Sequence, residues 1–325
     1  MTKEEFRKLT ENILILDGAT GSNLMKAGMP RGVCTESWVL EHKDVIQSLQ
    51  KAYIEAGSHI IYAPTFGGNR INLTMHGLED QIEQINHTLA GYTKEITPEG
   101  VYVAGDITTT GKMMAPAGDM TYEKAFETYQ EQIGYLRDAG VDLIVAETMI
   151  NIEETLAAVD ACQSVCDLPI ICTVTVEADG SIFSGGNAVE AAMSLEAAGA
   201  SAVGINCSVG PDQLVSVVRN IKEAVSWYEM ASAQGNIEAK NNLAFCYQKG
   251  RGVHKDVKEA IRLYGEAAAG GHASAQYNLG YCYWYGEGVK TDKSRAIELF
   301  KQSADNGNAK AAQMLKILSQ HLFMK

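Results

Sequence analysis

The sequence predicts an α/β domain followed by an all-α repeat domain. Three observations lead to this fold class. Short apolar segments alternate with amphipathic segments up to residue 206, polar residues follow the apolar segments, and a 36-residue period takes over from residue 223. We therefore predict two domains, residues 1–222 and residues 223–325.

Six segments of the first domain are predicted to be buried strands, because each is a short apolar or β-branched run followed by polar and small residues. Helical patterns lie between them, including residues 42–56, 122–139 and 152–165. Strands that alternate with helices indicate a parallel sheet, and continuously apolar strands indicate that both of its faces are covered. The predicted strands are residues 13–17, 59–63, 101–105, 143–147, 169–174 and 202–206.

Polar or reactive side chains follow these strands at their carboxyl ends. A (β/α)8 barrel places its active site at this end, and an open doubly wound sheet binds its ligands there as well. The pattern alone is compatible with both folds. No Gly-x-Gly-x-x-Gly run follows the first strand, which argues against a dinucleotide-binding sheet. The strand-end residues are Asp17, Thr65, Asp106, Glu147, Thr175 and Cys207.

The C-terminal domain is predicted to be an α-solenoid because its residues recur with a fixed step. Alanines 224, 260 and 296 and glycines 235, 271 and 307 are each spaced by 36 residues. Such a period, with two helices per unit, is typical of stacked helical repeats. A Gly-x-Gly-Val turn at residues 250–253 returns at residues 286–289 and predicts left-handed backbone at its glycines. The units resemble Sel1-like repeats, which are related to tetratricopeptide repeats.

Composition excludes several classes of function. Residues 1–222 carry 14 Lys/Arg against 30 Asp/Glu, so we expect no nucleic-acid binding, which needs clustered cations. No apolar run is long enough to span a bilayer, so no membrane association is expected. Seven cysteines and a charged N-terminal segment without a signal-peptide core predict reduced thiols and a cytoplasmic location.

Five runs of the first domain together resemble the homocysteine S-methyltransferase family, which includes the homocysteine-binding barrel of cobalamin-dependent methionine synthase. The resemblance implies a (β/α)8-type barrel, here truncated after six strands because a full barrel needs about 250 residues. The runs are Leu16-Asp17-Gly18-Ala19-Thr20-Gly21, residues 63–70, Gly105-Asp106-Ile107-Thr108-Thr109-Thr110-Gly111, Ala146-Glu147-Thr148-Met149 and residues 204–211.

The resemblance also implies a chemistry. In the family, three cysteine thiolates hold zinc, and the homocysteine sulfur takes the fourth position as a thiolate that attacks a methyl group to give methionine. On this basis Asp17 and Glu147 would pair with the substrate ammonium, Asn206 would lie beside the substrate, and Cys207 would be a zinc ligand. No cobalamin-binding run is present, so methylcobalamin would come in trans from a separate corrinoid protein; betaine or S-methylmethionine are other possible donors.

The sequence departs from the family pattern at the metal. The family's two other zinc ligands are adjacent cysteines in a Gly-Gly-Cys-Cys run, and this chain has no Cys-Cys pair. Cys162 and Cys166 share a helix face and are interpreted as core residues, with a metal pair as the alternative. Cys246 and Cys282 occupy equivalent repeat positions and are interpreted as buried packing residues. Asp106 and Thr65 are interpreted as hydrogen-bonding residues that anchor loops.

Two alternatives to an enzyme remain open at the level of sequence. One is a non-catalytic scaffold whose repeats bind a protein partner. The other is a recombined or misassembled chimera, because a barrel helix ends near residue 222 and the repeat begins in mid-unit at residue 223.

Overall fold

The computed structural model describes residues 1–207, 209–249 and 256–322. The chain divides into two compact units, Met1–Val217 and Val218–Lys325. The division falls within helix α10 (Pro211–Ala233), five residues before the predicted boundary at residue 222. Within the described residues, no helix is both long and apolar enough to cross a membrane.

The first unit contains a five-stranded parallel sheet in the order β1-β2-β3-β4-β5, so neighbours in space are also neighbours along the chain. Each connection carries a helix, as parallel pairing requires. The α/β prediction for this unit is confirmed. The strands are β1 (Ile60–Ala63), β2 (Tyr102–Ile107), β3 (Leu143–Met149), β4 (Ile170–Val174) and β5 (Ala202–Ile205).

The segment at residues 13–17, predicted as a sixth strand, pairs with β1 at one parallel bridge, Leu16 to Ile60. Ile15 accepts hydrogen bonds from the N–H groups of His59 and Ile60. Ile13 is 88% exposed and Ile15 48% exposed, so this segment lacks the cover that would support a longer strand. The prediction of a full strand at residues 13–17 is therefore wrong, because only one bridge of it forms.

One face of the sheet packs against the N-terminal helix α1 (Lys3–Leu9). Phe6 of α1 is buried in a cluster with Ile60, Ala104 and Val145, which point to this same face. The opposite face is covered by later helices. A Cβ built on Gly105 would lie 2.9 Å from Leu136 Cδ1 of helix α7, so glycine allows that helix to approach the strand closely.

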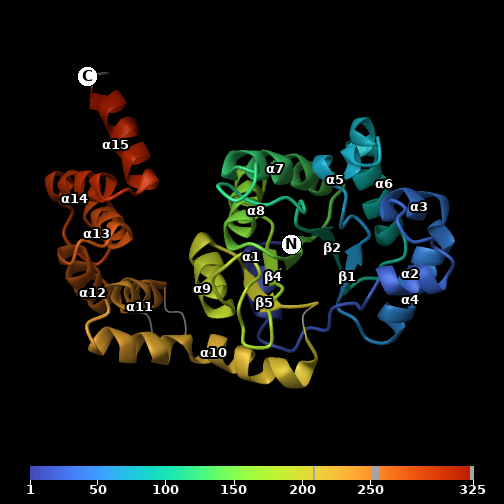
Figure 1. Cartoon of the computed structure of the whole chain (residues 1–325), viewed down its shortest axis with the longest axis horizontal. Coiled ribbons are helices and arrows are strands. Elements are labelled where there is room, and N and C mark those ends of the chain that lie inside the picture. Colours follow the sequence, from blue (N-terminus) through green and yellow to red (C-terminus); the bar gives the residue numbers. More distant parts are fainter. Residues whose placement is uncertain (208, 250–255, 323–325) are drawn as a thin grey trace. The chain divides into compact units, whose positions relative to one another are not determined.

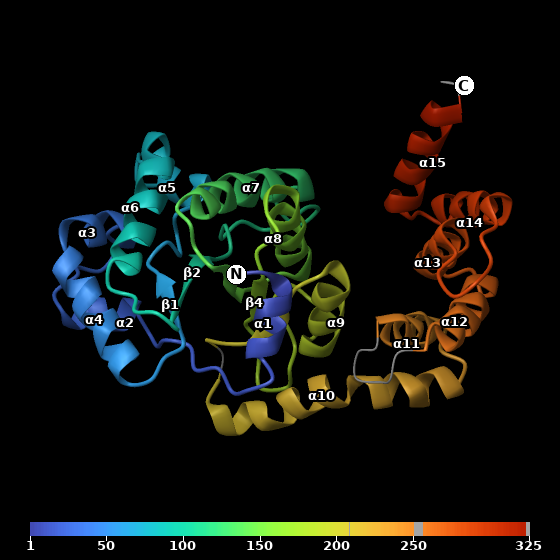
Figure 2. The same cartoon turned by 180° about the vertical axis from the view of Figure 1, so that it is seen from behind.

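Helices α7, α8 and α9 follow one another around the sheet (Figures 1 and 2). The predicted helices at residues 42–56, 122–139 and 152–165 are confirmed to within one residue at each end. The remaining helices of the unit are α2 (Gly21–Lys26), α3 (Thr35–Glu41), α4 (Lys43–Glu55), α5 (Arg70–Thr74), the 3-10 helix η1 (Glu79–Gln81), α6 (Ile82–Lys94), α7 (Tyr122–Asp138), α8 (Ile152–Val165) and α9 (Ala188–Ala198).

The second unit is helical in its described residues, as the 36-residue period predicts. Its apolar repeat positions form the core: Ala260 and Ala296 are fully buried, and so are Tyr264 and Phe300. Cys246 and Cys282 are buried as predicted. Its helices after α10 are α11 (Ile237–Lys249), α12 (Val257–Ala269), α13 (Ala273–Tyr285), α14 (Lys293–Asp305) and α15 (Ala309–Leu322).

The glycines of the second Gly-x-Gly-Val turn adopt the predicted left-handed backbone, with φ of 74° for Gly286 and 71° for Gly288. The periodic glycines Gly235, Gly271 and Gly307 are left-handed as well, with φ between 88° and 91°. The first Gly-x-Gly-Val turn, at residues 250–253, lies outside the described residues. After each turn an aspartate, Asp256 or Asp292, caps the next helix.

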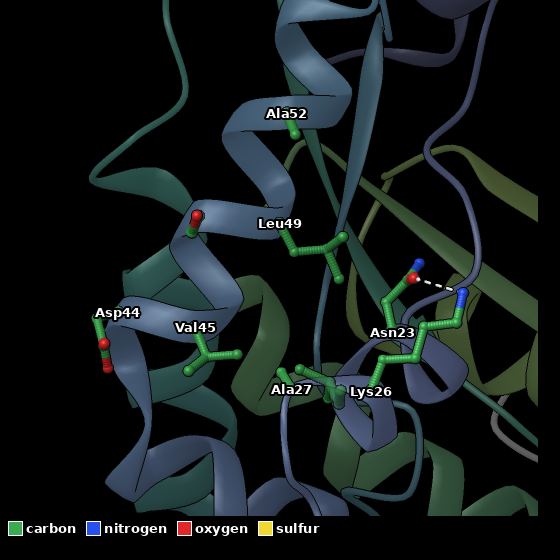
Figure 3. A pocket seen from close by; sticks show the side chains of 9 residues that line it. Asn23, Lys26, Ala27, Asp44, Val45, Leu49 and Ala52 are labelled. Carbon is green, nitrogen blue, oxygen red and sulfur yellow. Dashed lines mark hydrogen bonds between the residues drawn. The ribbon is translucent and has the colours of Figure 1, made fainter.

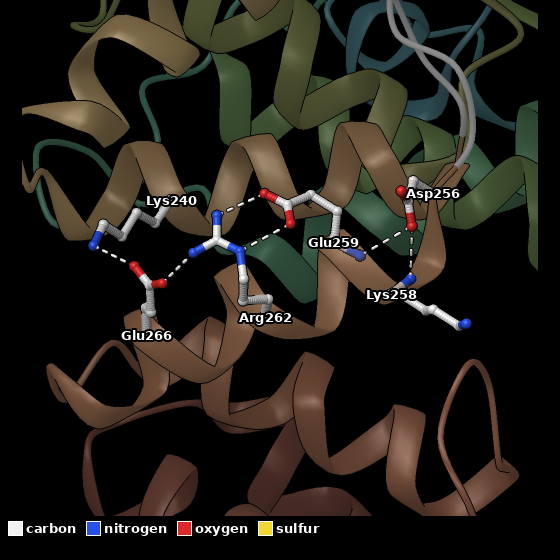
Figure 4. Close-up of polar contacts among 6 residues, drawn as sticks. All are labelled: Lys240, Asp256, Lys258, Glu259, Arg262 and Glu266. Carbon is white, nitrogen blue, oxygen red and sulfur yellow. Dashed lines mark hydrogen bonds and ion pairs between the residues drawn. The ribbon is translucent and has the colours of Figure 1, made fainter.

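An ion-pair network joins α11 to α12 (Figure 4). Arg262 donates to both oxygens of Glu259, at 2.8 and 2.6 Å, and also pairs with Glu266. Glu266 in turn accepts from Lys240 of α11 at 2.6 Å. Because these side chains are partly exposed, each pair is expected to stabilise the unit by less than about 1 kcal/mol.

Candidate functional site

Four polar residues of the sheet lie on the same face near its carboxyl edge. Side chains alternate along a strand, so Asp106 shares the face of Ala104, and Glu147 shares the face of Val145. The register pairs Thr173 of β4 with Gly204 of β5, two residues before Asn206. The α1-packed core lies below this edge on the same face. The sheet therefore brings Asp106, Glu147, Thr173 and Asn206 together.

A β-bulge interrupts the regular pairing of strand β3 with β4 at this edge. Ala146 pairs with Cys172 and Met149 pairs with Val174, so two residues, Glu147 and Thr148, lie opposite Thr173 alone. Thr148 has φ of 58°, a left-handed conformation that is rare for a β-branched residue. Bulges and strained residues of this kind are concentrated next to functional sites.

Asn206 holds the bulge in place. Its Nδ2 donates to Glu147 Oε2 at 3.2 Å and to Thr148 Oγ1 at 3.0 Å. Its Oδ1 accepts from the Thr148 N–H at 3.1 Å. Burial raises the pKa of Glu147, and the hydrogen bond from Asn206 opposes that rise. Glu147 and Asn206, both predicted as substrate-binding residues, are direct neighbours although 59 positions separate them in the chain.

Asp17 lies at the edge beyond β1. Its Oδ2 accepts the Tyr62 N–H at 2.8 Å, so the carboxylate continues the ladder that the short N-terminal segment begins. Burial and the charge of Glu147 raise the pKa of Asp17 to about 7. The interaction with Glu147 places both predicted carboxylates in one electrostatic cluster.

Asp106 is the most deeply buried member of this cluster, with 5% of its surface exposed. Its Oδ1 has no hydrogen-bond partner within the described part of the chain. Burial, followed by the charges of Glu147, Asp17 and Glu36, raises the pKa of Asp106 well above its usual range. Each group whose charge acts on Asp106 is an anion, so no cation among the described residues compensates these charges.

Thr65, unlike Asp106, anchors a loop as predicted. Its Oγ1 donates to the Asp106 carbonyl at 2.9 Å and accepts the Asp106 N–H at 3.1 Å. The interpretation of Asp106 as a loop anchor is wrong for its carboxylate, because the anchoring bonds use only its backbone. The sequence pattern could not reveal this, because an aspartate that anchors a loop and an aspartate that belongs to the site both stand at a strand end.

Cys207 follows Asn206 directly and is exposed. Its φ of 47° is the second left-handed non-glycine conformation at this edge. Among the residues that the structure describes, no three His, Cys, Asp or Glu side chains are grouped so as to hold a metal ion. Cys207 is thus placed at the site, and the described donors beside it do not complete a zinc set of three protein ligands.

A buried carboxylate that sequence reasoning missed supports the loop after β2. Glu154 of α8 is fully buried and accepts hydrogen bonds from Thr109 Oγ1, Thr110 N, Thr110 Oγ1 and Tyr129 OH at 2.7 to 2.9 Å. The loop it fixes includes Thr108, whose Oγ1 donates to the Glu147 carbonyl at 2.8 Å. The run of three threonines shortly after Asp106 was the available signal, because hydroxyl groups that become buried need hydrogen-bond partners.

A pocket lies between α2 and α4 and is lined mainly by apolar side chains (Figure 3). Its polar members include Asn23 and Lys26, which contact each other at 3.5 Å, and Asp44. None of the predicted site residues lines it. The candidate site is therefore the strand-end cluster rather than this pocket.

Comparison with known proteins gives two family matches. The family described as homocysteine S-methyltransferase matches residues 14–279, and the Sel1 repeat matches residues 273–308. Methionine synthase of Mycobacterium leprae (strain TN) is 25% identical over 232 residues, which cover 66% of this chain and 19% of that protein. The S-methylmethionine–homocysteine S-methyltransferase BHMT2 of Pongo abelii is 27% identical over 215 residues, 66% of this chain and 56% of that protein.

Among solved structures, the homocysteine methyltransferase MmuM of Escherichia coli, in its metallated form, is similar in fold. The TM-score is 0.56 at 16% identity, over 66% of this chain and 82% of that chain. The chain thus spans about a fifth to just over half of the length of the two curated relatives described above.

Proposed function

The chain belongs to the homocysteine S-methyltransferase family, and on that premise we propose that its strand-end cluster binds homocysteine as the acceptor for transfer of a methyl group, giving methionine. The observation that carries the proposal is the cluster of carboxyl groups of Asp17, Asp106 and Glu147, with Asn206 bonded to Glu147 and Cys207 next to Asn206 in the chain.

The ammonium group of an amino acid matches what this cluster lacks. Burial raises the pKa values of Asp17, Asp106 and Glu147, and the charge of Glu147 adds to the rise for Asp17 and Asp106. No cation among the described residues offsets these shifts. A bound ammonium would favour the ionised carboxylates and would gain charge-assisted hydrogen bonds in return. Glu147 is the best-positioned acceptor, because Asn206 already holds its side chain.

The position of Cys207 supports placing the substrate sulfur at the exposed end of β5. A thiol must lose its proton to become a good nucleophile for a methyl group. In the family, zinc bound by three thiolates would stabilise the sulfur as a thiolate. Here the described residues supply Cys207 and no further pair of suitable ligands, so they do not fit that zinc site. The proposed binding of homocysteine therefore depends only on described residues. Methyl transfer by the family's zinc chemistry would require zinc ligands in addition to Cys207.

The methyl donor is proposed from relatives alone. The names of two relatives include S-methylmethionine and betaine, and methionine synthase is a third type of relative. If this chain acts in the manner of methionine synthase, we propose that its donor is methylcobalamin, supplied in trans by a corrinoid protein. The second candidate function is a protein-binding scaffold in the cytoplasm, in which the helical repeats bind the partner. The incomplete set of zinc ligands among the described residues favours this alternative.

One experiment separates these functions. The purified full chain is assayed for zinc by elemental analysis, for homocysteine binding by calorimetry, and for methionine formation with S-methylmethionine, betaine or methylcobalamin as donor. Stoichiometric zinc that is lost in Cys207→Ala, together with methionine formation, would support the enzyme. Homocysteine binding without methionine from any donor would favour a scaffold that retains the substrate site. Absence of homocysteine binding would refute the proposal.

A further inference from the structure

Two cysteine sulfurs lie in contact at the end of helix α8, on residues that the proposed function does not use. Cys162 is in the last turn, and Cys166 is the residue that caps the helix. The two Sγ atoms are 3.7 Å apart. The sequence-based interpretation of both as core residues is correct for Cys162, which is 1% exposed, and wrong for Cys166, which is half-buried.

The backbone at the cap explains why the sulfurs meet. Cys166 has φ of −158° and ψ of 167°, so the chain leaves the helix there in an extended conformation. Its N–H still donates to the Cys162 carbonyl at 3.0 Å, and its Sγ donates to the same oxygen at 3.4 Å. The side chain of Cys166 is thus turned back toward Cys162 while remaining outside the helix.

The surroundings make the two thiols unequal. The hydrogen bond from the Cys162 thiol lowers the pKa of Cys166 to about 6, with further contributions from a backbone N–H at Leu168 and from Arg137, against burial and Asp167. The same hydrogen bond and burial raise the pKa of Cys162, although Lys3 opposes the rise. Arg137 is held at this point by its hydrogen bond to the Val165 carbonyl, 2.8 Å away. Cys166 is therefore the more acidic thiol of the pair and ionises before Cys162.

We propose that Cys162 and Cys166 are a peroxide-reactive dithiol that closes to a reversible disulfide. The Cys166 thiolate attacks one peroxide oxygen, the O–O bond breaks, and Cys166 becomes a sulfenic acid as hydroxide leaves. Cys162 then loses its proton, and its sulfur attacks the Cys166 sulfur. The S–S bond forms, the S–O bond breaks, and the leaving hydroxide takes up a proton as water. In total, two thiols lose two electrons and hydrogen peroxide is reduced to two water molecules.

The geometry allows this closure with a small movement. The sulfurs must approach from 3.7 Å to about 2.0 Å. Cys166 can supply that movement because it lies beyond the last helical residue, so the helical hydrogen bonds before it remain. A thiol such as dithiothreitol would reverse the reaction by exchange.

The chain sequence provides a clean readout. Cleavage before Asp160 and before Asp167 releases the segment 160–166, which contains Cys162, Cys166 and no other cysteine. The full chain is treated with hydrogen peroxide, its remaining thiols are alkylated, and this segment is analysed by mass spectrometry. We expect it to be lighter than the reduced peptide by two hydrogen atoms and to bear no alkyl group, and we expect dithiothreitol to restore both thiols.

Matched variants test the assigned roles. In Cys162→Ala, the sulfenic acid of Cys166 has no partner and should be captured by dimedone; in Cys166→Ala, Cys162 should remain an unlabelled thiol. Cys207→Ala, which removes an exposed cysteine elsewhere, should leave closure unchanged. Circular dichroism of each variant verifies folding, and Cys162→Ser replaces the alanine variant if that one does not fold. The proposal is overturned if the 160–166 segment keeps two alkylated thiols once Cys207 is oxidised, or if dimedone labels Cys162 in Cys166→Ala.

Discussion

The side-chain amide of Asn206 donates a hydrogen bond to Glu147 Oε2 at 3.2 Å and thereby joins the end of β5 to the end of β3. Strand β4 lies between them, and its Thr173 Oγ1 accepts from the Thr148 N–H at 3.3 Å. The three strand ends form one connected polar edge.

Replacing Asn206 with alanine should weaken homocysteine binding about tenfold. The change removes the donor that positions Glu147 and the bonds that hold Thr148 in its left-handed conformation; one such hydrogen bond contributes about 1 kcal/mol. Calorimetric titration with homocysteine measures the effect. The matched control is Asn187→Ala, which removes the cap of α9 at a cost of about 1 kcal/mol in stability. Equal affinity losses in both variants would show that Asn206 acts only through stability.

Homocysteine affinity should rise as pH increases through about 7. The pKa of Asp17 is about 7, so the carboxyl group is mostly neutral below that pH and attracts an ammonium only after it ionises. Titrations from pH 6 to 8 in buffers of different ionisation enthalpy would also detect the proton released on binding. Asp17→Asn should flatten the pH dependence. An unchanged pH profile in that variant would assign the effect to another group.

The same carboxyl group should make the unliganded chain less stable as pH rises from about 4 to about 7. The pKa of Asp17 is raised in the folded state from its ordinary value of 3.8 to about 7, so between these values the folded state binds more protons than the unfolded state. Stability then falls with increasing pH, by at most about 1.4 kcal/mol per pH unit for this one group. Urea unfolding of the chain and of Asp17→Asn measures the difference. A parallel pH dependence in both would contradict the assignment.

Replacing Glu154 with alanine should destabilise the first unit by about 3 kcal/mol or more. The side chain is fully buried, and its loss leaves the donors of Thr109, Thr110 and Tyr129 without their acceptor. Glu153→Ala is a matched control one residue away, because that side chain is exposed and its loss should change stability by less than about 0.5 kcal/mol. Chemical denaturation followed by circular dichroism compares them. Similar values for the two variants would refute the role of Glu154.

In the second unit, Gly288→Ala should cost more stability than Gly271→Ala. Both glycines have left-handed backbone, with φ of 71° and 88°, so each substitution carries a penalty of about 1 kcal/mol. A Cβ on Gly288 would also lie 2.5 Å from Val257 Cγ1, whereas nothing lies within 4 Å of a Cβ on Gly271. The expected additional loss is about 1 to 3 kcal/mol. Thermal unfolding of the two variants provides the comparison, and equal shifts would contradict the predicted contact.

Much of the fold could be predicted because it is recorded in local patterns. Helix α8 begins and ends where its apolar spacing predicts, and the repeat glycines have the backbone that only glycine adopts readily. The segment at residues 13–17 shows the limit of this reasoning. Its apolar residues predict a strand, but the number of hydrogen bonds it makes depends on cover that the described residues do not provide.

The sequence by itself determined the two-part architecture, the family, and which polar residues stand at strand ends. Only the tertiary structure decided how those residues combine: the bulge that places Glu147 and Thr148 opposite Thr173, the bond from Asn206 to Glu147, and the Oδ1 of Asp106, which has no hydrogen-bond partner among the described residues. It also decided that Cys166 leaves its helix toward Cys162. The physical reason is the separation along the chain over which each effect acts. Helix and strand periods act between near neighbours, whereas register, burial and electrostatic coupling join residues tens of positions apart and exist only once the strands have paired.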